Sequence, residues 1–171
     1  MELTRCWLAP AVVVVLMLSG CSTAQAPASF GESQDARNLQ CVHLARGDRV
    51  LIGDTVTSRS SALRIRSVNL VDARGVRVVR AWLLRTPGGT SLGVTDVPPS
   101  RTIASEIGWD TRVNADGAEL AAKSSRNVVL EVQKTASTRG SAAAIRLRVV
   151  ASDHEYDVDS GVRYRFPQRC F

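Results

Sequence analysis

The sequence predicts an all-β protein whose folded part is a single antiparallel β-sandwich of about seven strands. From Arg49 onward, apolar and polar residues alternate with a period of two, as in strands that have one buried and one exposed face. Turn-forming residues recur about every ten residues, and no stretch has a clear helical period. The hydrophobic fraction of 44% is too high for a disordered chain, although only 5% of the residues are aromatic.

Three strands are expected early in the folded part, at 49–57, 63–71 and 76–84. The segment 72–75 (DARG) has the composition of a hairpin turn between the second and the third. In the second strand the apolar residues change parity between Ile65 and Val68, which predicts a β-bulge near Ser67. In the third strand Trp82 shares the parity of the apolar residues, so it is expected in the core.

Further alternating strands are expected around 129–133, 145–149 and 155–166. Glycine and proline make 86–100 a loop, and 118–123 is expected to form one helical turn at most. No internal repeat is evident, so one domain is expected.

Two strand pairings can be derived from the expected turns. A hairpin loop at 136–141 would place Val132 opposite Ile145. A two-residue turn at 152–153 would pair two arginines with two aspartates on the outer face of the sheet, Arg148 with Asp157 and Arg146 with Asp159.

The amino-terminal residues indicate export. Arg5 precedes an uncharged apolar run at 6–18, which is shorter than the roughly 20 residues of a membrane-spanning helix. The tetrapeptide Leu18-Ser19-Gly20-Cys21 resembles the lipobox of bacterial lipoprotein precursors. That resemblance implies that Cys21 is acylated and becomes the first residue of the mature protein, anchored stably by two or more acyl chains. An ordinary secretory signal with an incidental cysteine is the alternative.

The resemblance divides the chain into three parts. Residues 1–20 are expected to be a lipoprotein signal peptide. Residues 21–40 are expected to be a flexible tether, because they are rich in Ala, Ser, Gln and Pro. Residues 41–171 are expected to be the β-sandwich domain.

Cysteine usage agrees with an exported protein. Cys6 would leave with the signal peptide and Cys21 would carry lipid, so Cys41 and Cys170 remain and form a natural pair in an oxidising compartment. A disulfide between them would constrain the unfolded chain by roughly 5 kcal/mol. Two free buried thiols are the alternative.

The general pattern resembles the small immunoglobulin-like β-sandwich domains of exported bacterial lipoproteins. It departs from true immunoglobulin domains, because Cys41 and Cys170 lie at opposite ends of the domain and do not bridge two core strands around a tryptophan. The resemblance therefore implies an architecture and no activity.

No metal or cofactor is expected. The carboxylates of 153–159 (DHEYDVD) share one parity, but along a strand they diverge by about 6.6 Å per pair of residues, and neighbouring arginines would neutralise them. A salt-bridge ladder is favoured there over a calcium site. Cys41-Val42-His43 looks like part of a copper or zinc site, yet His154 is the other imidazole and the mature chain has no methionine.

The sequence does not indicate an enzyme. It contains no G-x-S-x-G nucleophile elbow, although a Ser-His-Asp triad assembled from loops remains an alternative. Trp109, beside loop residues, is expected either to plug one end of the sandwich or to form an exposed platform for a sugar ring or a partner. With Arg101 and Arg112 it makes up the candidate contact surface.

The chain is basic, with a net charge of +6 and twenty arginines against two lysines. This composition is typical of a G+C-rich genome, but it also favours anionic lipid headgroups or phosphate-bearing wall polymers. No nucleic-acid recognition motif is present, so nucleic acid is not an expected partner.

These observations predict a non-catalytic interaction module on the extracytoplasmic face of the cell membrane, held there by its lipid. Its expected partner is a cell-envelope protein or polymer. A binding module for a small ligand or an envelope glycan, using Trp109 and the 86–100 loop, is the alternative. A hydrolase is the third hypothesis.

Overall fold

The computed structural model describes residues 26–31, 38–85 and 92–170. These residues form mainly antiparallel β-sheets, which confirms the all-β prediction. The strands are β1 (Ala28–Phe30), β2 (Leu39–Cys41), β3 (Arg49–Ser58), β4 (Leu63–Val71), β5 (Val76–Arg85), β6 (Gly93–Asp96), β7 (Val113–Asn114), β8 (Glu119–Leu120), β9 (Ser125–Lys134), β10 (Gly140–Ala142), β11 (Ala144–Ala151), β12 (His154–Asp159) and β13 (Arg163–Phe166).

The described residues thus contain thirteen strands, and the expected number of about seven is wrong. Seven of the thirteen have four residues or fewer, which is too short for a period of two to be recognised in the sequence. Two short helices, α1 (Arg101–Glu106) and the 3₁₀ helix η2 (Trp109–Thr111), follow β6.

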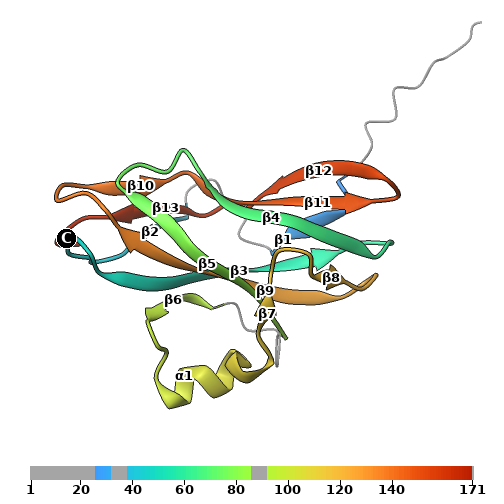
Figure 1. Cartoon of the computed structure of the whole chain (residues 1–171), viewed down its shortest axis with the longest axis horizontal. Helices are drawn as coiled ribbons and strands as arrows, with labels where there is room; N and C mark the ends of the chain where they lie inside the picture. Colours follow the sequence, from blue (N-terminus) through green and yellow to red (C-terminus); the bar gives the residue numbers. More distant parts are fainter. Residues whose placement is uncertain (1–25, 32–37, 86–91, 171) are drawn as a thin grey trace, which may run out of the picture.

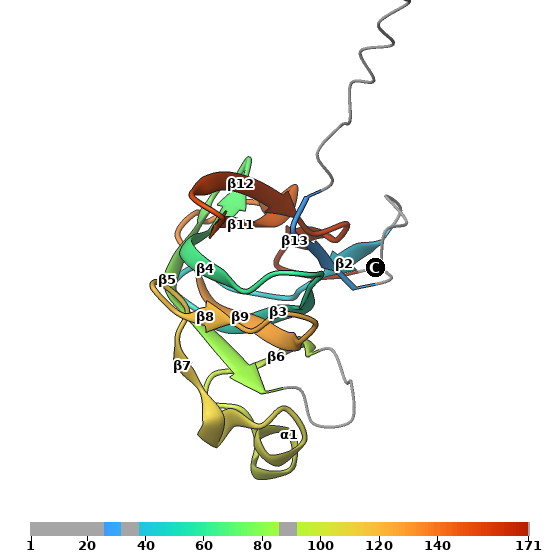
Figure 2. The ribbon, with the colours of Figure 1, turned by 90° about the vertical axis from the view of Figure 1, so that its right-hand side faces the viewer.

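The strands lie in two layers that face each other (Figure 1, Figure 2). One layer is the large sheet, with the strand order β1-β3-β9-β5-β7 and with β6 paired to β3. The other layer contains the four-stranded sheet β12-β11-β4-β8 and the three-stranded sheet β10-β13-β2. The pairing of β13 with β2 is parallel, which departs from the antiparallel arrangement expected throughout.

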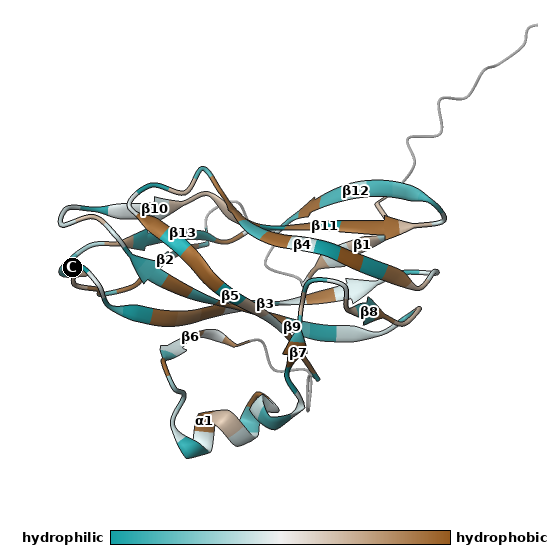
Figure 3. Ribbon diagram, viewed as in Figure 1, coloured by the Kyte–Doolittle hydropathy of each residue, from teal (hydrophilic) through white to brown (hydrophobic). Residues whose placement is uncertain are grey.

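One apolar core lies between the layers. Its side chains come from all three sheets, for example Ile52 and Leu130 of the large sheet, Leu147 of the four-stranded sheet and Phe166 of the three-stranded sheet. Figure 3 shows the resulting alternation of hydrophobic and hydrophilic residues along strands such as β4 and β5. Each such side chain contributes about 1.5–3 kcal/mol by leaving water.

Two bulges decide which side chains reach this core. In β4 the pairing with β11 skips Arg66, which confirms the bulge predicted near Ser67. In β5 the pairing with β9 skips Val79. This second bulge reverses the parity of the strand, so Trp82 faces away from the main core, and the prediction for Trp82 is wrong for that reason.

Of the two predicted strand pairings, the one across 136–141 is wrong and the one across 152–153 is confirmed. β9 pairs with β3 and β5, and β11 pairs with β4 and β12, so Val132 does not lie opposite Ile145 as expected. Both side chains are fully buried in the same core, because alternation identifies a buried face but not the partner strand. The turn at Ser152 and Asp153 is confirmed, and both residues have the positive φ that a type I′ hairpin turn requires.

The expected tether and loops contain short strands. β1 lies within 21–40 and pairs with β3, burying Ala28 and Phe30, so the tether prediction fails there and at the start of β2. β6 lies within the expected loop 86–100, of which 86–91 lies outside the described residues. The segment expected to form one helical turn contains β8.

Candidate functional site

The structure confirms the disulfide between Cys41 and Cys170. Their Cα atoms lie 5.9 Å apart although 129 positions separate them in the sequence. The bond joins β2 to the segment that follows β13, at the end of the molecule where Figure 1 marks the C-terminus. Cys21, the expected lipid attachment site, lies outside the described residues together with the expected signal peptide.

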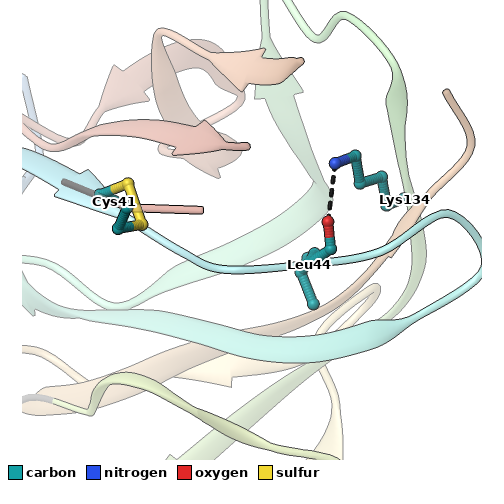
Figure 4. The surroundings of a disulfide bond; sticks show 4 residues. Cys41, Leu44 and Lys134 are labelled. Atoms are coloured by element: carbon teal, nitrogen blue, oxygen red, sulfur yellow. Dashed lines mark hydrogen bonds between the residues drawn. A yellow bond between two sulfur atoms is a disulfide. The ribbon is translucent and has the colours of Figure 1, made fainter. Parts of the chain in front are cut away.

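A buried lysine fixes the segment that follows Cys41. Lys134 is 1% exposed, and its Nζ donates a 2.7 Å hydrogen bond to the carbonyl of Leu44 (Figure 4). The Val42 amide also donates to the Arg165 carbonyl at 2.8 Å. These bonds hold the chain between β2 and β3 against β9 and β13, next to the disulfide.

The three residues of the candidate contact surface are only partly brought together. The ring of Trp109 lies 5.1 Å from that of Trp82 in an edge-to-face arrangement, over the outer face of the large sheet. The Arg112 guanidinium lies 4.8 Å from the Trp109 ring centroid, and its Nη1 donates to the Trp109 carbonyl. Arg101 is exposed at the start of α1 and has no recorded contact with either.

Trp109 belongs to a second, smaller apolar cluster. Fully buried side chains of this cluster include Leu51, Leu84 and Val129 of the large sheet. Trp109 and Ile107 cover them from the α1–η2 segment. Trp109 is therefore a half-buried cover on a sheet face, which differs from both the end plug and the open platform expected from the sequence.

The carboxylates of β12 form the expected salt-bridge ladder. The Arg148 Nε donates to Asp157 at 2.9 Å and the Arg146 Nε donates to Asp159 at 2.6 Å. Arg146 also lies 3.5 Å from Asp157. Within 26–31, 38–85 and 92–170, no three His, Cys, Asp or Glu side chains are grouped so that they could hold a metal ion.

The ladder predicts a pH dependence of stability. The hydrogen bond from Arg148, with the charges of Arg148 and Arg146, lowers the pKa of Asp157. A carboxyl whose pKa falls on folding stabilises the protein above its unfolded pKa, and this contribution is lost as the pH falls below about 4. We expect Asp157→Asn to lower the thermal midpoint at pH 7 but to have a progressively smaller effect below pH 4. Thermal unfolding across this pH range measures the difference, and Asp153→Asn is the control. A difference that did not change with pH would contradict the ladder's role.

The most distinctive surface is a groove over the three-stranded sheet. Two adjoining hollows, of about 600 Å³ and 1010 Å³, share Ser141 and Arg165 in their linings. Five arginines line them, and we call this surface the arginine groove: Arg74, Arg139, Arg163, Arg165 and Arg169.

Strand pairing explains how these arginines meet. Arg74 pairs with Ser141, Ser141 with Arg165, and Arg165 with Cys41, so the four lie in one row across the strands. Neighbouring strands are about 4.8 Å apart, which places Arg74 and Arg165 about 10 Å apart at the backbone. Arg163 lies two residues before Arg165 and faces the same side.

A small side chain and a tightly packed glycine form the floor of the groove. Between the arginines, β10 presents Ser141 on the outer face, and Gly140 packs closely against the core, where an added Cβ would lie 2.9 Å from Val76 and 3.3 Å from Phe166. Tyr164, the aromatic residue in the lining, is 1% exposed and packs with Phe166 in the core. Burial, with a smaller effect of the Asp54 charge, raises the pKa of the Tyr164 hydroxyl, so it stays neutral beneath the groove.

The charges of the groove are not neutralised within the described part of the chain. The ion pairs found there use five other arginines, namely Arg49, Arg64, Arg66, Arg146 and Arg148. With the described residues the groove arginines make no ion pair or side-chain hydrogen bond. Asp72 is the one carboxylate among the described residues of the lining.

Sequence reasoning missed this site. Arg163 and Arg165 were visible as the polar face of an alternating strand, but nothing marked them as different from the ladder arginines. Arg74 and Arg139 lie in connecting segments, 89 and 24 positions before the start of β13, and reach it through pairings that the sequence does not encode locally. The excess of arginine over acidic residues in 161–171 was the available signal.

Comparisons with known proteins leave the family open. No family model and no curated protein matches the chain. Two solved structures resemble it at 12% identity: a family 123 glycoside hydrolase from Clostridium perfringens, with a TM-score of 0.44, and the secreted serine protease VesC from Vibrio cholerae, with a TM-score of 0.35. The matches cover 81% and 82% of this chain but only 27% and 23% of those two. Among the described residues, no helix is long and apolar enough to span a membrane.

Proposed function

We propose that the protein is an exported lipoprotein, anchored at the extracytoplasmic face of the cell membrane through Cys21, that binds an anionic partner of the cell envelope without catalysing a reaction. Its folded part is then an immunoglobulin-like β-sandwich used as a binding module. The observation that carries this proposal is the arginine groove, whose five cations face solvent with one carboxylate among them.

The disulfide supports the proposed location. Cys41 and Cys170 are exposed, and disulfides form and persist mainly in oxidising compartments outside the cytoplasm. The lipobox Leu18-Ser19-Gly20-Cys21 supports the anchor. Confinement to a membrane raises the effective concentration of the domain toward neighbouring partners, which suits a binding module.

The groove supports binding over catalysis. Its lining offers arginine, serine and backbone groups, and His43 and His154 lie outside it. Guanidinium groups recognise carboxylates and phosphates through two parallel hydrogen bonds, and the groove presents several of them on rigid strands. The surface around Trp109 suits a glycan less well, because Arg112 already lies over the ring.

The anchoring is tested with two cysteine variants of the full chain in its native host. We expect the wild type in the membrane fraction, with its amino-terminal peptide starting at a diacylglyceryl-modified Cys21 in mass spectra. Cys21→Ala should remain uncut and carry no lipid mass, whereas the matched Cys6→Ala, within the signal peptide, should behave as the wild type. An unmodified Cys21 in wild-type protein would refute the proposal.

A further inference from the structure

We propose that the arginine groove binds a linear polymer whose repeats carry phosphodiester groups, laid as an extended chain across the three-stranded sheet. The inference rests on the proposed function for the location of the domain outside the cell. It goes further by naming the chemical class of the ligand and the surface that holds it.

The separation of the arginines into two groups is the first argument. On the four-stranded sheet, Arg146 and Arg148 are neutralised by Asp157 and Asp159 across the hairpin. On the three-stranded sheet the groove arginines have Asp72 as their one acidic neighbour among the described residues of the lining. Five like charges gathered around two adjoining hollows repel each other, so a polyanion that neutralised them would bind favourably.

The shape of the groove is the second argument. The two hollows share Ser141 and Arg165 in their linings, so they lie side by side on the same face of the three-stranded sheet. Arg74 and Arg163 line one end, and Arg139 and Arg169 line the other. A linear chain can lie across both hollows and meet cations at successive repeats, whereas a flat bilayer surface would meet only their rim.

The composition of the lining is the third argument. Tyr164 is buried and packs in the core, so among the described lining residues no aromatic ring is available to stack on a sugar or a base. Stable protein–protein interfaces need apolar anchors near their centre. Among the described residues, the apolar side chains here are Leu39, the disulfide-bonded Cys41, the small Ala142 and Ala143, and Pro167. Recognition by charge alone is favoured over an acidic protein partner.

The position of the groove is the fourth argument. β1, where the described chain begins its first strand, pairs with the Val56–Ser58 end of β3 and lies in the half of the molecule away from β2, β10 and β13 (Figure 1). Seven positions separate Cys21 from Ala28, enough for about 25 Å of extended chain. An attachment at that end of the molecule leaves the groove free to face a polymer on the side away from the membrane.

The test measures binding to three polyanions at several salt concentrations. The protein is the full chain carrying Cys21→Ala, so that no acyl chain contributes to binding. The probes are a synthetic poly(glycerol phosphate), poly-L-glutamate and vesicles of phosphatidylglycerol. For five neutralised phosphates the logarithm of the affinity should fall with the logarithm of the salt concentration with a slope of about 3.5, or roughly a hundredfold between 50 and 200 mM.

Two double variants isolate the groove. We expect Arg163→Gln/Arg165→Gln to weaken poly(glycerol phosphate) binding about tenfold or more and to reduce the salt slope by about 1.4. Arg59→Gln/Arg80→Gln removes the same charge from exposed arginines outside the groove lining and should leave the slope unchanged. Circular dichroism and thermal midpoints verify that both variants fold.

Each alternative outcome overturns the proposal in a recognisable way. Equal groove-dependent binding of poly-L-glutamate would indicate an acidic protein partner, and equal groove-dependent binding of the vesicles would indicate the bilayer. Equal weakening by both double variants would show that net charge acts without a site. If poly(glycerol phosphate) did not bind, the proposed ligand class would be wrong. The anchoring at Cys21 is measured separately and would not be affected by that result.

Discussion

Replacing both disulfide cysteines, Cys41→Ser/Cys170→Ser, should lower the free energy of unfolding by about 5 kcal/mol. The bond closes a loop of 129 positions, and a loop of that length removes much of the conformational freedom of the unfolded chain. Domains of this size are stable by about 5–15 kcal/mol, so the double variant should keep at most about 10 kcal/mol of its stability.

Urea unfolding followed by tryptophan fluorescence measures this loss. With a slope of about 2 kcal/mol/M, the midpoint should move down by about 2.5 M. Reduction of the wild type with a thiol should produce the same shift, and the double variant should not respond to the thiol. The expected stabilisation would be disproved by a variant whose midpoint equalled that of the oxidised wild type. If the variant does not fold at all, the reduced wild type supplies the comparison.

Phe166→Ala should destabilise the domain by about 3–5 kcal/mol. Phe166 is fully buried, lies 6.2 Å from the Tyr164 ring between centroids, and packs against the strand that forms the groove floor. Removing the ring leaves a cavity that the surrounding sheets cannot close, because the neighbouring side chains are held by strands on both layers.

A graded set of variants checks this expectation. Phe166→Leu keeps most of the volume and should cost less than about 1.5 kcal/mol. Val113→Ala, at a side chain 53% exposed, should stay within about 0.5 kcal/mol of the wild type. A Phe166→Ala protein as stable as Val113→Ala would show that the three-stranded sheet is not packed onto the core as described.

The long strands could be predicted from the sequence because their signals are local. The Ser152–Asp153 turn fixes the register of β11 and β12, so Arg148 and Asp157 could be paired correctly without any structure. The bulge in β4 was visible because its apolar residues change parity within the strand itself. In each case the residues that interact are few positions apart or lie in the same strand.

The predictions that failed concern residues whose structure depends on pairing with strands far away in the sequence. The bulge at Val79 follows from how β5 pairs with β9, about fifty residues later, and it turns Trp82 to the outer face. β1 and β2 have three residues each, and their strand conformation depends on pairing with β3 and β13. The arginine groove likewise depends on pairings that join the 72–75 turn, β10 and β13, so the excess of arginine in 161–171 could indicate only part of it.

The disulfide also determines how the protein responds to tension. A pull between the amino-terminal attachment and residue 170 would be transmitted from Cys170 to Cys41 across one covalent bond. The 128 residues between them would then carry no load, and β3 to β13 would stay folded while the covalent path bore the strain. A load applied at the carboxyl-terminal end of the described chain would therefore reach Cys41 without unfolding these strands.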